Sequence, residues 1–545
     1  MGGDRQRSRV QGNYMMNDRG EARRKKPEKW KQGLKQQEAP KAPASIPAPN
    51  SDHCLTQVIK KILPSPSDKI AVFIFRRDLR IFDNTSLIAA AADGFKILPV
   101  FIFPPEQIEE KENEYFSHPC VQFMCQSLSQ VHKELEKLSS KLHFIKLSNK
   151  DALTELKKEV NFEAVYSNED YSFYAVSRDN EVRSWCRENR VKFVQKEDYG
   201  MMKLDENLDK FKRPIRTHAA FMRGFRANYT VRRPTEVPWT GANFASYDLN
   251  CEIPEEKIHT FYQNNPKLAV RPGRTGGMEN LKSFEKLVDY RAVHNMLDLE
   301  TSRSSPHTKF GTVSVRETYW RGFDLFGEDF HVIRQLGWRE MYLKVYAARP
   351  EWQKGQAIHK VLDEHVDWSY DEEVFQKWCL GETGFPIVDA GMRELNETGF
   401  QHNRARMNCA SILTKILLID WRWGYKYFYQ KLVDSDIFNN TAGWGVLSST
   451  GLGQGSAGPD NPPYINPFNP FMQSQKFDPN CEYIKKWVPE LANVHARDIH
   501  KWQDQAVRRK YPNCKYPAPI VNYSQAAQRC HDIFTKAASI AKSVK

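Results

Sequence analysis

The chain has 545 residues, of which 40% are hydrophobic. This length exceeds what one hydrophobic core usually holds, so we expect two structured domains. The formal net charge of +13 favours a polyanionic partner such as nucleic acid, although a basic N-terminal segment supplies part of it. The ten cysteines lack C-x-x-C pairs and metal-ligand spacing, and no apolar run reaches membrane-spanning length. We therefore expect an intracellular protein with reduced thiols, no metal site and no membrane segment.

Residues 1–67 are rich in Arg, Lys, Gln, Pro and Ala and show almost no apolar periodicity. Such a segment cannot bury enough apolar surface to fold, so we predict a disordered basic tail. Its run Arg23-Arg24-Lys25-Lys26 fits a nuclear import signal or a non-specific DNA tether, and also a solvated basic tail with no dedicated partner. A nuclear location is compatible with this run.

Residues 68–205 alternate between short apolar runs and helical patterns. The runs predict buried strands at 70–75, 97–103, 142–147, 162–167 and 191–195. Helical patterns at 121–138 and 152–159 lie between them, which predicts a doubly wound parallel sheet of the α/β class. No G-x-G-x-x-G follows the first strand, and this argues against an ordinary dinucleotide dehydrogenase.

Residues 206–278 are rich in Pro, Asn, Arg and Gly and predict a long connector between domains. From residue 279 to 545 helical patterns dominate, and we find no convincing strand. The last segment, 526–545, predicts one terminal amphipathic helix. The predicted fold is thus an α/β domain joined by a long connector to an all-α domain.

The helical part carries a polar set that suits a planar, phosphate-bearing cofactor. The run from Thr301 to Ser305 places hydroxyls and backbone N–H groups ahead of a helical segment, as phosphate sites often do, although such a run is also an ordinary helix cap. Arg406 could pair with Asp434 around a ligand, or form a plain structural ion pair.

Several motifs in combination resemble those of the photolyase/cryptochrome family. They include Phe75-Arg76-Arg77-Asp78-Leu79-Arg80, Asn168-Glu169-Asp170-Tyr171, His402-Asn403-Arg404-Ala405-Arg406-Met407 and the segment from Asp434 to Trp444. The resemblance covers roughly residues 69–500 and is strongest to class I cyclobutane pyrimidine dimer DNA photolyases. It implies an N-terminal Rossmann-like antenna domain and an all-helical FAD-binding domain. It also implies that a second chromophore, methenyltetrahydrofolate or a deazaflavin, could occupy the antenna domain.

By this resemblance, the FAD-binding residues are Tyr290, Thr301, Ser302, Arg303, Ser304, Ser305, Asn403, Arg406, Asp434, Asp436 and Asn440. Ser304 stands where the family usually has Leu. Asn440 matches the position that faces flavin N5. Asn is typical of photolyases there, whereas plant-type cryptochromes usually have Asp and insect-type ones Cys, so this residue favours repair over signalling.

The resemblance also assigns Trp368, Trp421 and Trp444 to a chain that passes electrons from the surface to the flavin. Tryptophans are commonly plain core residues, and the chain has 13 of them. The three nevertheless fall at the family's spacings. We therefore predict an intact photoreduction triad.

The predicted DNA and lesion contacts are Gln335, Trp338, Arg339, Asn403, Arg404 and Met407. Here the chain departs from the class I pattern. Gln335 replaces a Glu, Val446 replaces a lesion-packing Trp, His294 and Asn466 replace two arginines, and residues 452–461 form an insertion. Gln335 is typical of (6-4) enzymes, whereas Asn403 stands where those enzymes carry a second His.

The resemblance implies light-driven repair of UV-damaged DNA, in which reduced FAD donates an electron to a flipped-out cyclobutane dimer. The predicted catalytic residues are Asn440, Gln335, Trp338, Trp444, Trp421 and Trp368. Two alternatives stay open at this point: a (6-4) photolyase, and a cryptochrome-like blue-light receptor without repair activity. We expect the protein to act as a monomer.

Overall fold

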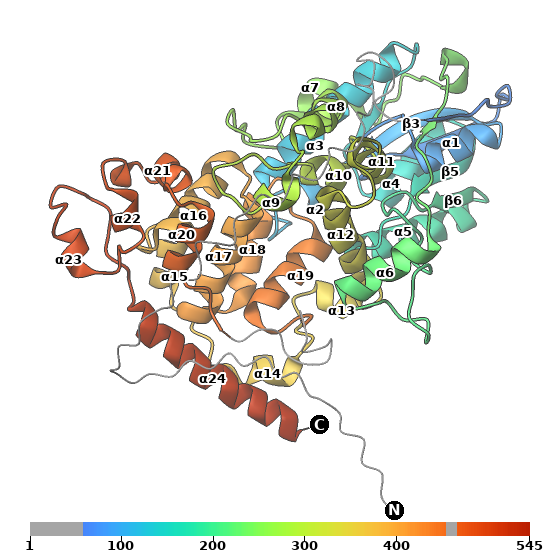
Figure 1. The fold of residues 1–545 in the computed structure, drawn as a ribbon. Coiled ribbons are helices and arrows are strands. Elements are labelled where there is room, and N and C mark those ends of the chain that lie inside the picture. The colour runs from blue at the N-terminus through green and yellow to red at the C-terminus, as the bar shows by residue number, and fades with distance from the viewer. Residues whose placement is uncertain (1–57, 454–465, 545) are drawn as a thin grey trace, which may run out of the picture. The chain divides into compact units, whose positions relative to one another are not determined.

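The computed structural model describes residues 58–453 and 466–544, and its N-terminal part is built on a six-stranded sheet (Figure 1). The strand order is β6-β5-β2-β3-β4-β8. The strands are β2 (Ile70–Ile74), β3 (Lys96–Ile102), β4 (His143–Ile145), β5 (Phe162–Asn168), β6 (Lys192–Lys196) and β8 (Glu252–Ile253). The first five are parallel and coincide with the five predicted strands, while β8 runs antiparallel at one edge.

Helices cover both faces of this sheet, as the doubly wound prediction requires. Alternate side chains of β2 point to opposite faces, because the side-chain period of a strand is two. Phe73 packs in one cluster with α1 (Thr85–Ala92) and α3 (His118–Glu136). Val72 packs in another with α4 (Asn149–Glu159) and α5 (Phe173–Glu188). The predicted α/β class is therefore confirmed.

The chain begins its described part with β1 (Ile59–Lys60), which pairs in parallel with β7 (Thr235–Glu236). The sequence pattern places residues 58–67 in the disordered tail, and this short strand is a departure from that prediction. The pairing uses backbone groups, such as Ile59 N–H donating to Pro234 O at 2.9 Å. The sequence therefore has no apolar pattern that would predict this strand. Residues 1–57, with the basic run at 23–26, lie outside the described residues.

The connector is more structured than predicted. It contains α6 (His218–Asn228), β7, β8, α7 (Glu255–Ile258) and the first half of α8 (Gly273–Ser283), besides the 3₁₀ turn η1 (Gly241–Asn243). α6 packs against α12 (His331–Ala347) of the helical part, where Phe221 and Phe225 are buried. These short elements are stabilised by tertiary packing, and their own sequences signal them weakly.

The part of the chain described after residue 278 forms helices and loops, with one isolated bridge between Ser369 and Ile419. Figure 1 shows these helices from green-yellow to red. They are α9 (Tyr290–Val293), α10 (Ser305–Phe310), α11 (Val315–Phe326), α12 (His331–Ala347), α13 (Pro350–Gln353), α14 (Lys360–Glu364), α15 (Glu372–Leu380), α16 (Pro386–Thr398), α17 (Asn403–Ser411), α18 (Trp421–Lys431), α19 (Ile437–Ser448), α20 (Pro470–Phe477), α21 (Glu482–Trp487), α22 (Ala496–Ile499), α23 (Gln505–Arg508) and α24 (Tyr523–Ser543). Shorter turns are η2 (Phe284–Lys286), the π-helix η3 (Ile412–Ile416) and η5 (Pro489–Leu491). None of the described helices is both long and apolar enough to cross a bilayer.

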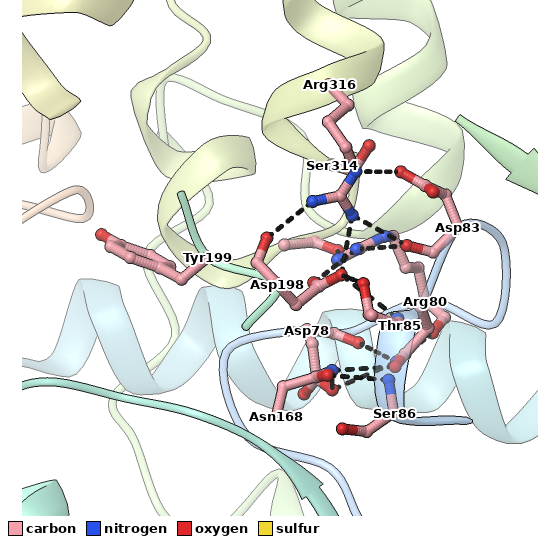
Figure 2. A network of polar contacts seen from close by, with 12 residues as sticks. Asp78, Arg80, Asp83, Thr85, Ser86, Asn168, Asp198, Tyr199, Ser314 and Arg316 are labelled. Carbon is pink, nitrogen blue, oxygen red and sulfur yellow. Dashed lines mark hydrogen bonds and ion pairs between the residues drawn. The ribbon is translucent and has the colours of Figure 1, made fainter. Parts of the chain in front are cut away.

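A buried network of alternating charges joins the loop after β2 to the helical part (Figure 2). The guanidinium of Arg316, on α11, donates to Asp83 Oδ2 at 2.8 Å and to Asp198 Oδ1 at 2.7 Å. Arg80 Nη2 donates to Asp198 Oδ2 at 2.6 Å. Burial alone would raise the pKa of Asp198, but the two arginines hold it well below the usual value. The motif that resembles the family's N-terminal signature thus holds sheet and helices together.

Candidate functional site

One large cavity, of about 520 Å³, lies in the helical part. Its walls come from the loop before α10 and from α12, α17 and α19. Every predicted site residue lines it except Trp368, Trp421 and Arg404. Segments more than a hundred residues apart in sequence therefore meet at one place, as the motif resemblance implied.

The hydroxyl-rich run forms one end of the cavity. The Ser302 backbone N–H donates to the Tyr290 hydroxyl at 3.3 Å, so the predicted tyrosine and the run lie together. Ser304 Oγ donates to Asn280 Oδ1 at 2.8 Å. Ser305 Oγ donates to Asp434 Oδ2 at 2.5 Å. With the Arg303 guanidinium in the same wall, this end offers a cation and hydroxyls suited to phosphate oxygens.

The predicted ion pair between Arg406 and Asp434 is present. Arg406 Nη2 donates to Asp434 Oδ2 at 2.9 Å, and the aspartate side chain is only 3% exposed. The second carboxylate oxygen, Asp434 Oδ1, is buried and has no hydrogen-bond partner among the residues that the structure describes. A buried acceptor without a donor costs roughly 1–3 kcal/mol, so this oxygen indicates a ligand with an N–H or O–H group. The imide N–H of a flavin ring is such a donor, and the residues fit FAD.

Asp436 fixes the start of the helix that carries Asn440. Its Oδ1 accepts the Asn439 N–H at 3.0 Å and caps α19, while Oδ2 accepts the Tyr199 hydroxyl at 2.6 Å and pairs with Arg77 at 3.1 Å. Burial would raise the pKa of Asp436, but the charge of Arg77 and the Tyr199 hydroxyl lower it, so the group stays ionised. Its oxygens are thus engaged by the protein itself.

Tyr199 is a cavity residue that the sequence patterns did not reveal. Its ring lies between two guanidinium groups, with Arg77 at 4.2 Å and Arg339 at 4.0 Å from the ring centroid. Figure 2 shows it beside the charge network. Arg77 belongs to the N-terminal motif from Phe75 to Arg80, so the sequence marked this arginine. No local sequence pattern marks Tyr199.

Arg339 and Arg404 are placed differently from the predicted DNA contacts. Arg339 is 9% exposed, and its guanidinium donates to Tyr199 O at 3.1 Å, so it supports the cavity wall and faces away from solvent. Arg404 does not line the cavity. It donates to Asn295 Oδ1 at 2.6 Å and stacks on Phe477 at 4.3 Å. The DNA contacts expected of both arginines stay predictions, and tertiary contacts decide where each guanidinium points.

Exposed side chains of α12 and α17 form an open mouth of the cavity. Gln335 on α12 and Asn403 on α17 are exposed there, beside Trp338 and Met407. Trp338 stacks on His218 of α6, with ring centroids 4.0 Å apart. Among the departures from the class I pattern, His294 and Val446 line the same cavity, and the insertion lies outside the described residues from 454 onward. Aromatic and Met surfaces at an open mouth suit stacked bases.

Asn440 lies on the first turn of α19 and lines the cavity. Its Nδ2 donates to the Tyr425 carbonyl at 3.1 Å, which holds the amide in one orientation. The neighbouring Trp444 also lines the cavity and is 2% exposed. The predicted N5-facing amide and the first triad ring therefore lie on successive turns of one helix.

The other two triad tryptophans lie together behind the cavity. The indole N–H groups of Trp421 and Trp368 both donate to Asp363 Oδ1, each at 3.2 Å. Trp421 is 1% exposed and Trp368 is half-buried, so the pair leads from the core toward the surface. Asp363, which also pairs with Arg422, was not predicted and is the group that holds the two rings in register.

Two family descriptions match the chain: "DNA photolyase" over residues 71–239 and "FAD binding domain of DNA photolyase" over residues 332–536. A deoxyribodipyrimidine photo-lyase of Synechococcus is 31% identical, and the match covers 83% of this chain and 94% of that protein. The archaeal photolyase of Sulfolobus tokodaii, solved with two FAD molecules, is 33% identical with a TM-score of 0.74 over 86% of this chain and 100% of that one. A class III photolyase of Agrobacterium tumefaciens is 26% identical with a TM-score of 0.77, over 87% and 99%.

Proposed function

The chain belongs to the DNA photolyase family, and we propose that it is a deoxyribodipyrimidine photo-lyase, an enzyme that repairs UV-damaged DNA with light. The observation that carries the proposal is the cavity itself. It joins a buried cofactor end, marked by Asp434, to an open end lined by Gln335, Trp338 and Met407. A blue-light receptor needs the first end, whereas the aromatic and Met surfaces of the second suit a stacked base or dimer.

FAD, when bound, would supply light absorption and the electron that splits a pyrimidine dimer. The hydroxyl run with Arg303 would hold its phosphates. Asp434, kept in place by Arg406, would accept its imide N–H, and Asn440 would lie beside its central ring. Asn440 is uncharged, so it tolerates negative charge on the reduced cofactor, where a carboxylate would repel it.

The chain's contribution to repair is positioning and the exclusion of water. Trp338 is held by its stack on His218, so it offers a fixed aromatic surface to a flipped-out dimer. Met407 adds an adaptable apolar contact. Gln335 is exposed at the same mouth and can donate a hydrogen bond to a pyrimidine carbonyl, although it cannot supply a proton as a carboxylic acid could.

Purified protein, reconstituted with FAD and reduced, should be illuminated with oligonucleotides that carry either a cyclobutane thymine dimer or a (6-4) photoproduct, beside dark controls. We expect repair of the first lesion only. Gln335→Glu should keep cyclobutane repair, because a protonated carboxyl group can donate a hydrogen bond to the same pyrimidine carbonyl. Repair of the (6-4) product alone would reassign the lesion, and repair of neither by a flavin-loaded protein would favour the receptor.

Three further expectations belong to this proposal. The protein works as a monomer, which light scattering of the DNA-free protein tests. It carries a second, light-harvesting chromophore in the α/β domain, which mass spectrometry of released chromophores tests; the Sulfolobus tokodaii photolyase was solved with two FAD molecules. Import of a fluorescent fusion into the nucleus, with and without the run Arg23–Lys26, tests the proposed nuclear location.

A further inference from the structure

Aromatic side chains make an unbroken series of ring contacts from the cavity to the surface, separate from Trp421 and Trp368. Trp444, in the cavity wall, contacts Trp378 with centroids 6.2 Å apart. The series continues to Phe375 at 5.8 Å. Phe375 contacts Trp423 at 5.1 Å, and Trp423 contacts Tyr370 at 5.9 Å. All four separations lie within the range of direct aromatic contact.

Burial decreases steadily along this series. Trp378 is fully buried, Phe375 and Trp423 are half-buried, and Tyr370 is 62% exposed. The rings come from α19, from α15, from α18 and from the loop before α15, so four segments combine to reach from the cavity to solvent. A packed core alone would not require such a large exposed ring at the end.

We propose that this series is a second route by which electrons reach the cofactor cavity from solvent, alongside the route through Trp421 and Trp368. The proposal rests on the proposed function, because it needs a light-excited cofactor that withdraws an electron from Trp444. Trp378 then passes an electron to the oxidised Trp444, and Trp423 passes one to the oxidised Trp378. Phe375 serves only as a bridge, since a phenyl ring is much harder to oxidise than an indole.

Tyr370 is the end of the route because its hydroxyl group has a proton acceptor. An oxidised phenol is stable only after it loses the hydroxyl proton, and the Tyr370 hydroxyl donates to Asp420 Oδ2 at 3.3 Å. The step converts a phenol and a carboxylate into a neutral tyrosyl radical and a carboxylic acid, with one electron passed inward. An external thiol then returns a hydrogen atom to Tyr370, thiyl radicals combine to a disulfide, and Asp420 releases its proton to solvent.

A second tyrosine at equal reach lacks such an acceptor and is the matched control. Tyr427 lies 5.8 Å from Trp378, as close as Phe375 does. Its hydroxyl donates to Asn396 Oδ1 at 2.6 Å and to the Cys379 carbonyl at 3.2 Å. Amide oxygens accept a hydrogen bond but do not take the proton at neutral pH. Ring separations alone would allow either tyrosine to end the route. Of the two, Tyr370 has a carboxylate that can take its proton.

The test uses the full chain loaded with oxidised FAD, flashed with blue light in the presence of a thiol, and followed by transient absorption and electron paramagnetic resonance. Trp368→Phe blocks the exit of the first route. In that background we expect cofactor reduction to persist and a tyrosyl radical to be detected by paramagnetic resonance. The resonance should narrow when the protein is made with ring-deuterated tyrosine. Adding Tyr370→Phe should abolish the signal and the reduction, whereas adding Tyr427→Phe should change neither.

Two results would overturn the route: no reduction in Trp368→Phe with FAD still bound, or a tyrosyl signal that survives Tyr370→Phe. Tyr370 is exposed, so its variant is expected to fold, and thermal unfolding checks this. Repair of a cyclobutane dimer by each variant after chemical reduction with dithionite bypasses both routes. Loss of repair there would count against the proposed function, and loss of light-driven reduction alone would concern only the route.

Discussion

Gly424 is the position where one methyl group should disturb the site most directly. A Cβ placed there would lie 2.1 Å from Trp444 Cη2 and 2.5 Å from Leu413 Cδ2, closer than such atoms pack. Overpacking costs about 1–3 kcal/mol, and the helix gains about 1 kcal/mol when Ala replaces Gly. Because Trp444 is 2% exposed and packed on Phe428 at 5.0 Å, we expect the upper end of that cost and a net loss of about 2 kcal/mol for Gly424→Ala.

Trp444 lines the cavity, so the added methyl group should push its ring into the cavity. We therefore expect Gly424→Ala to lower the affinity for FAD as well. Urea denaturation of the cofactor-free protein measures the first effect, and titration with FAD, followed by quenching of its fluorescence, measures the second. Gly443→Ala is the control for stability, because no atom lies within 4 Å of the place its Cβ would take and the helix should gain up to about 1 kcal/mol. An unchanged urea midpoint for Gly424→Ala would show that the wall around Trp444 is loosely packed.

Arg406→Ala should destabilise the protein by about 3 kcal/mol in urea denaturation, because it leaves the buried Asp434 carboxylate without a cation; a loss below about 1 kcal/mol would mean that water replaces the arginine. Asp198→Asn should cost about 3–5 kcal/mol in the same assay, since Arg316 and Arg80 lose the buried negative charge that they share. Burial lowers the pKa of His307 to about 3. Below about pH 6.5 the unfolded chain binds a proton at this histidine and the folded chain does not. His307 therefore lowers stability by up to about 1.4 kcal/mol per pH unit, and His307→Gln should remove this share of the slope in urea denaturation.

The sequence by itself determined the parallel strands of the sheet. β2 to β5 are short, largely apolar runs, as burial on both faces favours, whereas β6 is a half-buried edge strand that its position after a helical pattern helped to identify. It also determined which segments meet at the cavity, because motif residues such as Asn440, Asp434 and Tyr290 carry their chemistry in type and spacing. Local pattern and motif resemblance thus led to the right elements and most of the cavity wall.

Only the tertiary structure decided how individual side chains are used. Arg77 and Asp436 are 359 positions apart, yet they pair at 3.1 Å beside Tyr199, which no motif marks. The guanidinium of Arg339 is oriented by the Tyr199 carbonyl, and that of Arg404 by Asn295 and Phe477. Asp363 and the ring series through Trp378 likewise arise from packing between helices. Such contacts depend on distances between distant segments, and local sequence preference contains no information about those distances.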